Sequence, residues 1–302
     1  MALSIHTNYS ALTTNTALNK SNSLLATNQQ RLGTGLRINS AADDAAGLQI
    51  ATRLSAQSRG MSVAMRNTGD ATSMLQTAEG AFSEMTDIVQ RMKDLATQGA
   101  NGTNGGADLI SMQGEFDELG KELSNIIKNT RYAGERLFSD GTLVDGTAGK
   151  FAAAVSFQIG ASAAEKMSFE GDTQLGKVGD ALIAASASYE DGSVGTEIAS
   201  TADAATAVNT TAGATITLLE TALNELGSMR AKFGSTINRL NHTSNNLANM
   251  KDNTDMAKGR IMDADFAIES ANMSKNSMLM QSGISMLKQA GQMPGMVMGL
   301  LG

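Results

Sequence analysis

Small and apolar residues recur at every seventh position in two long stretches near opposite ends of the chain. The first stretch spans residues 50–96 and the second spans residues 219–254. A seven-residue apolar repeat keeps one stripe of a helix against a partner helix. The large members of these rows, the expected core seam, are Leu54, Met61, Leu75, Phe82, Val89, Leu219, Leu226, Phe233, Leu240 and Leu247. The pattern predicts a mainly α fold, a long antiparallel coiled-coil rod in which the N- and C-terminal ends are paired.

Two thinner stripes lie outside these rows. Residues 3–35 predict a helix rich in Asn, Ser and Thr, which are mediocre helix formers, so this helix should be marginal alone. Residues 262–302 predict a Met-rich helix whose broad apolar face needs partners on more than one side. The large apolar residues of the two stripes are Leu18, Leu25, Leu32, Leu279, Met286, Leu287, Met293 and Leu300.

The first long helix has clear start and stop signals. Ser40 and Asp43 have the spacing of a capping box, so the helix should begin near residue 42. A Gly/Asn turn over residues 99–106 ends it, and the short connection predicts an antiparallel third helix. The return helix should run over about residues 215–258.

The middle of the chain has a different pattern. Alternating apolar residues over 155–169 predict a β-hairpin. Small polar residues over 186–214 predict a compact loop or a weak helix. The chain therefore turns back through a region with little apolar material.

Composition supports thin helix-on-helix layers. The 302 residues include no Trp, 4% aromatic residues, 31 Gly and a single Pro. The net charge of −7, without a basic cluster, argues against nucleic-acid binding. No stretch approaches the roughly 20 apolar residues of a membrane span, so we expect no membrane insertion. The absence of Cys excludes disulfides and thiolate chemistry.

Residues with chemical potential do not form a catalytic or metal-binding pattern. The two histidines, His6 and His242, lack the additional ligands that a zinc site requires. Asp43 and Asp44 are adjacent and suit the start of a helix better than acid–base catalysis. We expect no enzyme activity, no catalytic, cofactor-binding or metal-binding residues and no cofactor. A regulatory coiled-coil module remains the alternative to a structural subunit.

Several segments carry a family resemblance. They are Leu36–Gly47, Val89–Gln98, Ala100–Asn104, Arg260–Phe266 and Ala271–Lys275. These segments, in this order, resemble the N- and C-terminal signatures of bacterial flagellin. The resemblance covers roughly residues 1–140 and 215–302, and it implies a subunit that polymerises into the flagellar filament used for motility. A flagellin-like hook–filament junction protein is the alternative within this resemblance.

The resemblance also implies a domain organisation. Residues 1–44 with 262–302 would form the inner-tube domain, in which the large apolar residues of the two outer stripes, from Leu18 to Leu32 and from Leu279 to Leu300, would mediate assembly with neighbouring subunits. Residues 45–180 with 212–261 would form the helical rod domain with its hairpin. Residues 181–211 would be a short variable insert, so this is a short form without the usual outer domains. The chain would be extracellular, exported by the flagellar type III apparatus without a cleaved signal peptide.

The resemblance implies partners besides other copies of the chain. They are an export chaperone on the C-terminal helix, cap and junction proteins, and the innate receptor Toll-like receptor 5, which binds the monomer. The receptor-binding positions would be Gln90, Arg91, Leu95 and Glu115. Helical spacing places Arg91 and Leu95 on one face, which we expect to be distinct from the seam of Val89. Alternatively, Arg91 is a subunit contact or a solvated charge.

Overall fold

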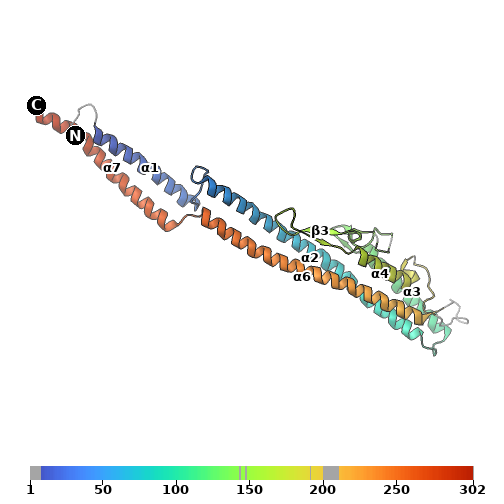
Figure 1. The fold of residues 1–302 in the computed structure, drawn as a ribbon. Coiled ribbons are helices and arrows are strands. Elements are labelled where there is room, and N and C mark those ends of the chain that lie inside the picture. The colour runs from blue at the N-terminus through green and yellow to red at the C-terminus, as the bar shows by residue number, and fades with distance from the viewer. Residues whose placement is uncertain (1–7, 143, 147, 191, 200–210, 302) are drawn as a thin grey trace. The chain divides into compact units, whose positions relative to one another are not determined.

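The computed structural model describes residues 8–142, 144–146, 148–190, 192–199 and 211–301, without the side chains of residues 293, 294 and 296–301 (Figure 1). The chain divides into two compact units. The central unit contains residues 59–251, and the terminal unit contains residues 1–58 and 252–302. In chain order the elements are α1 (Tyr9–Thr34), α2 (Ala45–Gly99), α3 (Gly106–Asn129), β1 (Arg131–Tyr132), β2 (Glu135–Arg136), the 3-10 helix η1 (Lys150–Ala152), β3 (Val155–Gln158), β4 (Lys166–Phe169), α4 (Asp172–Ala185), α5 (Ala187–Glu190), α6 (Ala212–Met262) and α7 (Phe266–Leu301). The mainly α fold class with a small β region is confirmed.

Within the central unit, α2 and α6 run antiparallel. The Arg230 guanidinium lies 3.0 Å from the Glu79 carboxylate. The Lys93 ammonium lies 2.9 Å from the Glu220 carboxylate. Residue numbers therefore increase along α2 where they decrease along α6. The apolar rows of the two helices meet in a large buried cluster and in a small one formed by Met61, Ala64 and Leu247.

Five phenylalanines form the centre of this cluster. Neighbouring ring centroids in the group lie 5.2–5.9 Å apart. The members are Phe82, Phe138, Phe151, Phe169 and Phe233. They come from α2, the segment after β2, η1, β4 and α6, so one aromatic group joins the helices to the β region. Aromatic contacts of this kind add about 0.5–1.5 kcal/mol per pair to the burial itself.

The start of α2 differs from its prediction. The Asp43 carboxylate accepts hydrogen bonds from the backbone N–H groups of Asn39 and Ser40 and from the Ser40 hydroxyl, which closes a turn instead of a helix. These hydrogen bonds lower the pKa of Asp43, and the bond from the Asn39 N–H has the largest effect. Asp44 then accepts from the N–H of Gly47 at 2.8 Å, as an N-terminal cap does, and the helix begins at Ala45.

The β region is partly as predicted. Strands β3 and β4 form the expected antiparallel hairpin, with Val155 opposite Phe169. The short β1–β2 pair and helix α4 were not predicted. Helix α4 buries Leu175, Val178 and Leu182 at helical spacing, but its Gly- and Asp-containing sequence hides that spacing among residues typical of loops.

The insert and the return helix follow the prediction where they are described. Residues 187–190 form the short helix α5 and residues 192–199 have irregular backbone, while residues 191 and 200–210 lie outside the described part. The buried Tyr189 hydroxyl donates to the Val144 carbonyl at 2.7 Å, and burial raises the pKa of Tyr189. The return helix α6 extends a few residues beyond its predicted ends on both sides.

In the terminal unit, α1 lies antiparallel beside α7 (Figure 1). At its base, the Arg37 N–H donates to the Met262 carbonyl and the Ala264 N–H donates to the Gly35 carbonyl. Gly35 has a positive φ of 72° and ends α1 in the left-handed conformation that favours glycine. Among the described residues, none of the helices combines the length and apolar character that a membrane crossing requires.

Candidate assembly and receptor surfaces

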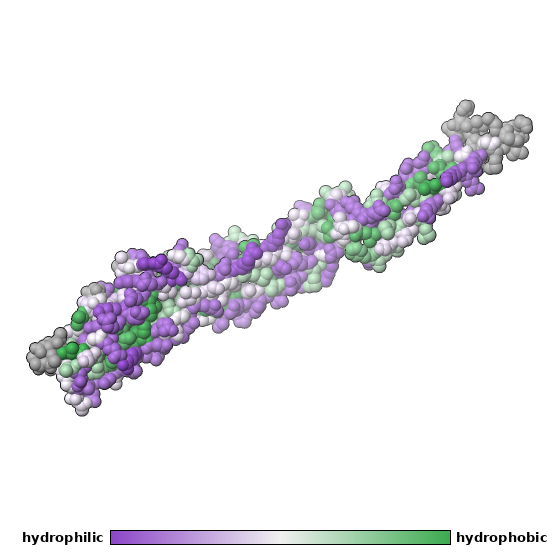
Figure 2. All heavy atoms as spheres, turned by 180° about the vertical axis from the view of Figure 1, so that it is seen from behind, coloured by the Kyte–Doolittle hydropathy of each residue, from purple (hydrophilic) through white to green (hydrophobic). Residues whose placement is uncertain are grey.

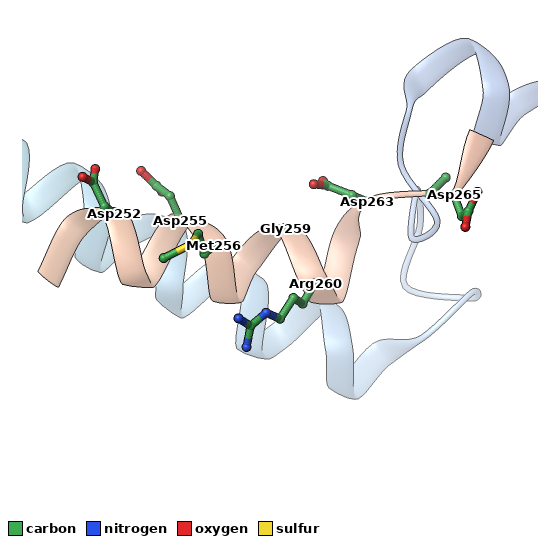
Figure 3. A pocket seen from close by; sticks show the side chains of 8 residues that line it. Asp252, Asp255, Met256, Gly259, Arg260, Asp263 and Asp265 are labelled. Carbon is green, nitrogen blue, oxygen red and sulfur yellow. The ribbon is translucent and has the colours of Figure 1, made fainter. Parts of the chain in front are cut away.

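The described residues contain no group of His, Cys, Asp or Glu side chains suited to hold a metal ion. An acidic depression of about 800 Å³ lies along the end of α6. Asp252, Asp255 and Asp263 project from one side of this helix, while Arg260 points the other way (Figure 3). Asp265, at the same depression, caps the start of α7 by accepting from two backbone N–H groups. The depression shows no arrangement for catalysis.

The pairing of α1 with α7 has a definite register. The Asn8 side chain donates to the Ala290 carbonyl at 2.6 Å at one end. Near the middle, Leu18 Cδ1 lies 3.0 Å from the position that a Cβ on Gly283 would take. From the first contact to the second, the residue number increases on α1 and decreases on α7. The two helices are therefore antiparallel along the seam.

This seam buries almost no large apolar side chain. Among the described side chains, Asn28 is the buried residue of α1, and Glu269, Asn276 and Ala290 are those of α7. The large apolar side chains are instead exposed, and Figure 2 shows apolar surface on the terminal helices. Those exposed by more than half are Tyr9, Leu12, Met256, Phe266, Ile268, Met278 and Met286. The terminal unit therefore presents apolar surface that a partner can cover.

The predicted assembly positions divide between two sides of the pair. Leu18, Leu25 and Leu32 are half-buried on the side of α1 that faces α7, and Leu287 is half-buried on α7. Leu279 and Met286 are 49% and 60% exposed. One residue along a helix is a rotation of about 100°, so the row through Leu287 contacts α1 and the row through Met286 does not. The side chains of Met293 and Leu300 lie outside the described part.

The predicted core seam lies mainly in the central unit. Its members there are all buried: Met61, Leu75, Phe82, Val89, Leu219, Leu226, Phe233, Leu240 and Leu247. Leu54 belongs to the terminal unit and is half-buried. The seam is therefore less buried at the end of α2 that contains Leu54.

The predicted receptor positions do not share one environment. The Arg91 guanidinium lies 2.6 Å from the Glu115 carboxylate, and the two side chains are 53% and 46% exposed. Gln90 is exposed beside them. Leu95, however, is 2% exposed and packs within the core that contains Val89. Leu95 is therefore not part of the exposed surface that Arg91 and Glu115 form, because its side of α2 is covered within the central unit.

Sequence reasoning missed a buried polar hub on α3. The Gln113 amide nitrogen donates to Asp117 at 2.8 Å and to Glu197 at 2.7 Å. Its oxygen accepts from the N–H groups of Ile198 and Ala199. All four hydrogen-bonding positions of the amide are therefore used, and the segment before residue 200 is attached to α3. A single Gln on an amphipathic helix gives no sequence signal of this role.

Paired helices with an apolar surface on one unit, and no catalytic cluster in the described residues, are features of a structural subunit. The family model of the bacterial flagellin N-terminal helical region matches residues 5–142, and that of the C-terminal helical region matches residues 216–301. The chain belongs to the bacterial flagellin family. It is a structural subunit that polymerises with other copies into the extracellular filament of the bacterial flagellum, and the family is not one of enzymes.

The similarity to individual flagellins extends over the whole chain. Flagellin of Bacillus subtilis (strain 168) is 39% identical over 304 residues, covering 98% of this chain and 99% of that protein. Flagellin A of Vibrio anguillarum is 34% identical over 388 residues, with full coverage of both. A solved structure described as a flagellar hook-associated protein from Vibrio parahaemolyticus has the same fold, with a TM-score of 0.56, 16% identity and coverage of 73% of this chain and 100% of that one. The 302-residue length fits a short flagellin without a variable domain.

Proposed function

We propose that the terminal helices of this filament subunit fold when it assembles. The observation that carries the proposal is the composition of the α1–α7 seam, where the buried side chains are polar or small. A helix pair that buries so little apolar surface gains too little free energy to offset the loss of chain entropy. Covering the exposed apolar side chains with a second copy supplies the missing free energy.

In this proposal the two units have different tasks. Residues 1–44 and 262–302 form the inner tube of the filament, residues 45–180 and 212–261 form the helical rod around it, and 181–211 is a short insert. The seam of the rod is complete within one chain, whereas the seam of the inner tube is completed by neighbours. The exposed Met286 and Leu279 are the inner-tube contacts on α7.

Circular dichroism before and after polymerisation tests the coupling. The helices in question contain 26 residues in α1 and 36 in α7. If both helices are unfolded in the monomer, the helical fraction of the chain rises on assembly by the fraction of residues that α1 and α7 contain. Equal helix content in monomer and filament would contradict the proposal.

The same unfolded ends suit export through a narrow channel without a cleaved signal peptide. An export chaperone then covers the Met-rich α7 before export, because Met side chains adapt to varied apolar surfaces. Deleting residues 262–302 should abolish chaperone binding, measured by co-purification. Retained binding would place the chaperone site elsewhere. Cap and junction proteins are the further proposed partners, at the ends of the filament.

A second proposed role is recognition of the monomer by Toll-like receptor 5. The supporting observation is the exposed patch of Gln90, Arg91 and Glu115, which spans α2 and α3. The ion pair holds Arg91 against α3 and presents a polar surface across the two helices. Leu95 packs in the core on the same helix, so we assign it an indirect part.

The receptor proposal can be tested with matched ion-pair variants. The double variant R91A/E115A should weaken receptor binding at least tenfold without changing the melting temperature, since exposed pairs contribute about 0–1 kcal/mol. The control is E118A/K121A, which removes another exposed pair on α3, with atoms 2.7 Å apart. Equal loss in both variants would contradict a specific role for Arg91 and Glu115.

A further inference from the structure

A polar cluster interrupts the seam between α1 and α7. The Arg31 guanidinium lies 3.0 Å from a Glu269 carboxylate oxygen, and the Glu269 side chain is only 9% exposed. With its amide oriented to satisfy both groups, Asn28 donates to the other Glu269 oxygen at 3.1 Å and accepts from Asn276 at 3.0 Å. Four side chains from two helices therefore meet in one network.

This polar network is not expected to stabilise the helix pair more than apolar residues at the same positions would. Arg31 Nε is buried without a hydrogen-bond acceptor among the described residues. Buried ion pairs are often no more stabilising than apolar residues of the same size, because both charges lose their hydration. The cluster therefore needs an explanation other than stability.

The rest of the seam contains little that distinguishes one register from another. On α1 it consists of small residues and leucines, such as Ala11, Leu18 and Leu25, and on α7 it includes Met280 and Leu287. Within each helix the seam positions are seven residues apart, or three or four residues apart within one repeat. A shift of the helices by seven residues, about 10 Å, would place similar side chains opposite one another.

We propose that Asn28, Arg31, Glu269 and Asn276 are the residues that fix the register of the terminal helix pair. A seven-residue shift would bring the Glu269 carboxylate to the level of Leu25 and separate it from Arg31. A buried charge without its partner is strongly destabilising, so the shifted pairing is excluded. Polar residues at seam positions select register in coiled coils in the same way, at a cost in stability.

Register matters here because the exposed apolar surface is composite. Leu12 on α1 and Met286 on α7 are 66% and 60% exposed. A shift would move all such side chains of one helix relative to those of the other, and a neighbouring copy would meet a different surface. The inference rests on the proposed assembly role of these helices, and the cluster would be a specificity determinant of that assembly.

Backbone contacts offer a competing explanation. The bonds from Ala264 to Gly35 and from Arg37 to Met262 also connect the two chain segments at the base of the pair. If these bonds alone set the register, the polar cluster could be replaced without consequence for the alignment. An experiment must therefore change the cluster and leave the base intact.

The chain contains no Cys, so a disulfide between two introduced cysteines shows directly which residues of α1 and α7 lie opposite each other. The pair L18C/G283C reports the observed register, and A11C/G283C reports the shift of seven residues that would bring Glu269 to the level of Leu25. Each pair is placed in the full-length protein with the natural cluster and in an all-leucine variant, N28L/R31L/E269L/N276L. Oxidative crosslinking is quantified in monomer and filament.

We expect only the L18C/G283C crosslink with the natural cluster, and at least tenfold less of the other. In the all-leucine variant both crosslinks should form in comparable amounts. The control Q30L/S270L changes exposed neighbours and should keep the observed register. If the all-leucine variant gives the L18C/G283C crosslink alone, or neither crosslink, the cluster does not select the register.

A single-residue variant provides a second readout. R31L leaves Glu269 buried without its counter-charge and should reduce filament yield at least tenfold, while R31L/E269L should recover it. Full assembly of R31L would also overturn the proposal. If crosslinks with the natural cluster appear already in the monomer, folding is not coupled to assembly, but the register test remains valid.

Discussion

The central and terminal units are both built around an antiparallel helix pair with seven-residue spacing, yet they are filled differently. Between α2 and α6 the rows contain Phe, Leu, Met and Val, and Phe82 of one helix contacts Phe233 of the other. Between α1 and α7 the buried residues, among the side chains that the structure describes, are Asn28, Glu269, Asn276 and Ala290. Spacing determines which side of a helix meets its partner, whereas the residues at those positions determine whether the pair is stable alone.

The difference corresponds to two uses of the same motif. A row of large apolar residues provides stability within one chain, about 1.5–3 kcal/mol for each fully buried side chain. A row of small and polar residues aligns two helices but stabilises the pair little. The large apolar residues of the same helices then remain exposed on the surface. A filament subunit needs both properties, one in each unit.

The largest effect should come from a charge in the aromatic cluster. Phe233 is fully buried and lies 5.5 Å from Phe82 and 5.4 Å from Phe169, between ring centroids. Phe233→Ala alone should cost about 3–5 kcal/mol, and Phe233→Asp more, because the carboxylate has no partner. We expect F233D, like L226D on the same row, to unfold the central unit and prevent filaments, measured by denaturant unfolding and electron microscopy. Normal polymerisation would show that this row is not a core.

A charge on the exposed row of α7 should separate assembly from stability. Met286 is 60% exposed, so Met286→Asp should leave the melting temperature of the monomer unchanged. It should nevertheless abolish filaments, because the carboxylate would be buried against a neighbour. The control M286L should assemble normally. Normal assembly of M286D would mean that this row remains exposed in the filament.

An intermediate effect is expected at the polar hub of the central unit. Gln113→Leu would leave the N–H groups of Ile198 and Ala199 without acceptors and remove a donor from Asp117. The expected loss is roughly 2–4 kcal/mol of unfolding free energy, the cost of at least two unpaired buried groups. The exposed Gln90→Leu is the control and should change stability by less than about 0.5 kcal/mol. Similar effects of both variants would contradict the assigned role of the hub.

The smallest effect is expected at the turn before α2. The pKa of Asp43 is lowered from its ordinary 3.8, chiefly by the backbone N–H of Asn39. A carboxylate with a lowered pKa stabilises the fold above its ordinary pKa, and this contribution is lost as the pH falls through the lowered value. Asp43→Asn should therefore reduce stability slightly at neutral pH and not in strong acid, as measured by thermal unfolding. Equal destabilisation at neutral and strongly acidic pH would contradict this role of the Asp43 carboxylate.

Much of the helical fold could be predicted from the sequence. The seven-residue rows, the Gly/Asn turn and the hairpin alternation are local patterns, and each is present as predicted. Helix α4 was missed because its Gly and Asp residues weaken a helical signal that becomes clear only when Leu175, Val178 and Leu182 are buried by neighbours. The start of α2 was placed early because Asp43 closes a turn before Asp44 caps the helix.

The surfaces were less predictable than the helices. The row through Leu279 and Met286 has the expected spacing, but the row through Leu287 contacts α1. Leu95 has the spacing of an exposed neighbour of Arg91, yet it is buried. Both differences arise because a broad apolar face has two possible seams, and only the position of the partner helix selects one.

The sequence by itself determined the mainly α fold, the pairing of the chain ends and the family, because periodicity and local motifs are properties of consecutive residues. The tertiary structure alone decided which rows meet and how polar groups are paired. Gln113 with residues 197–199, and Arg31 with Glu269, come from segments far apart in the chain. Hydrogen bonds and ion pairs act over only a few ångströms, so such partners become known only when the chain has brought them together.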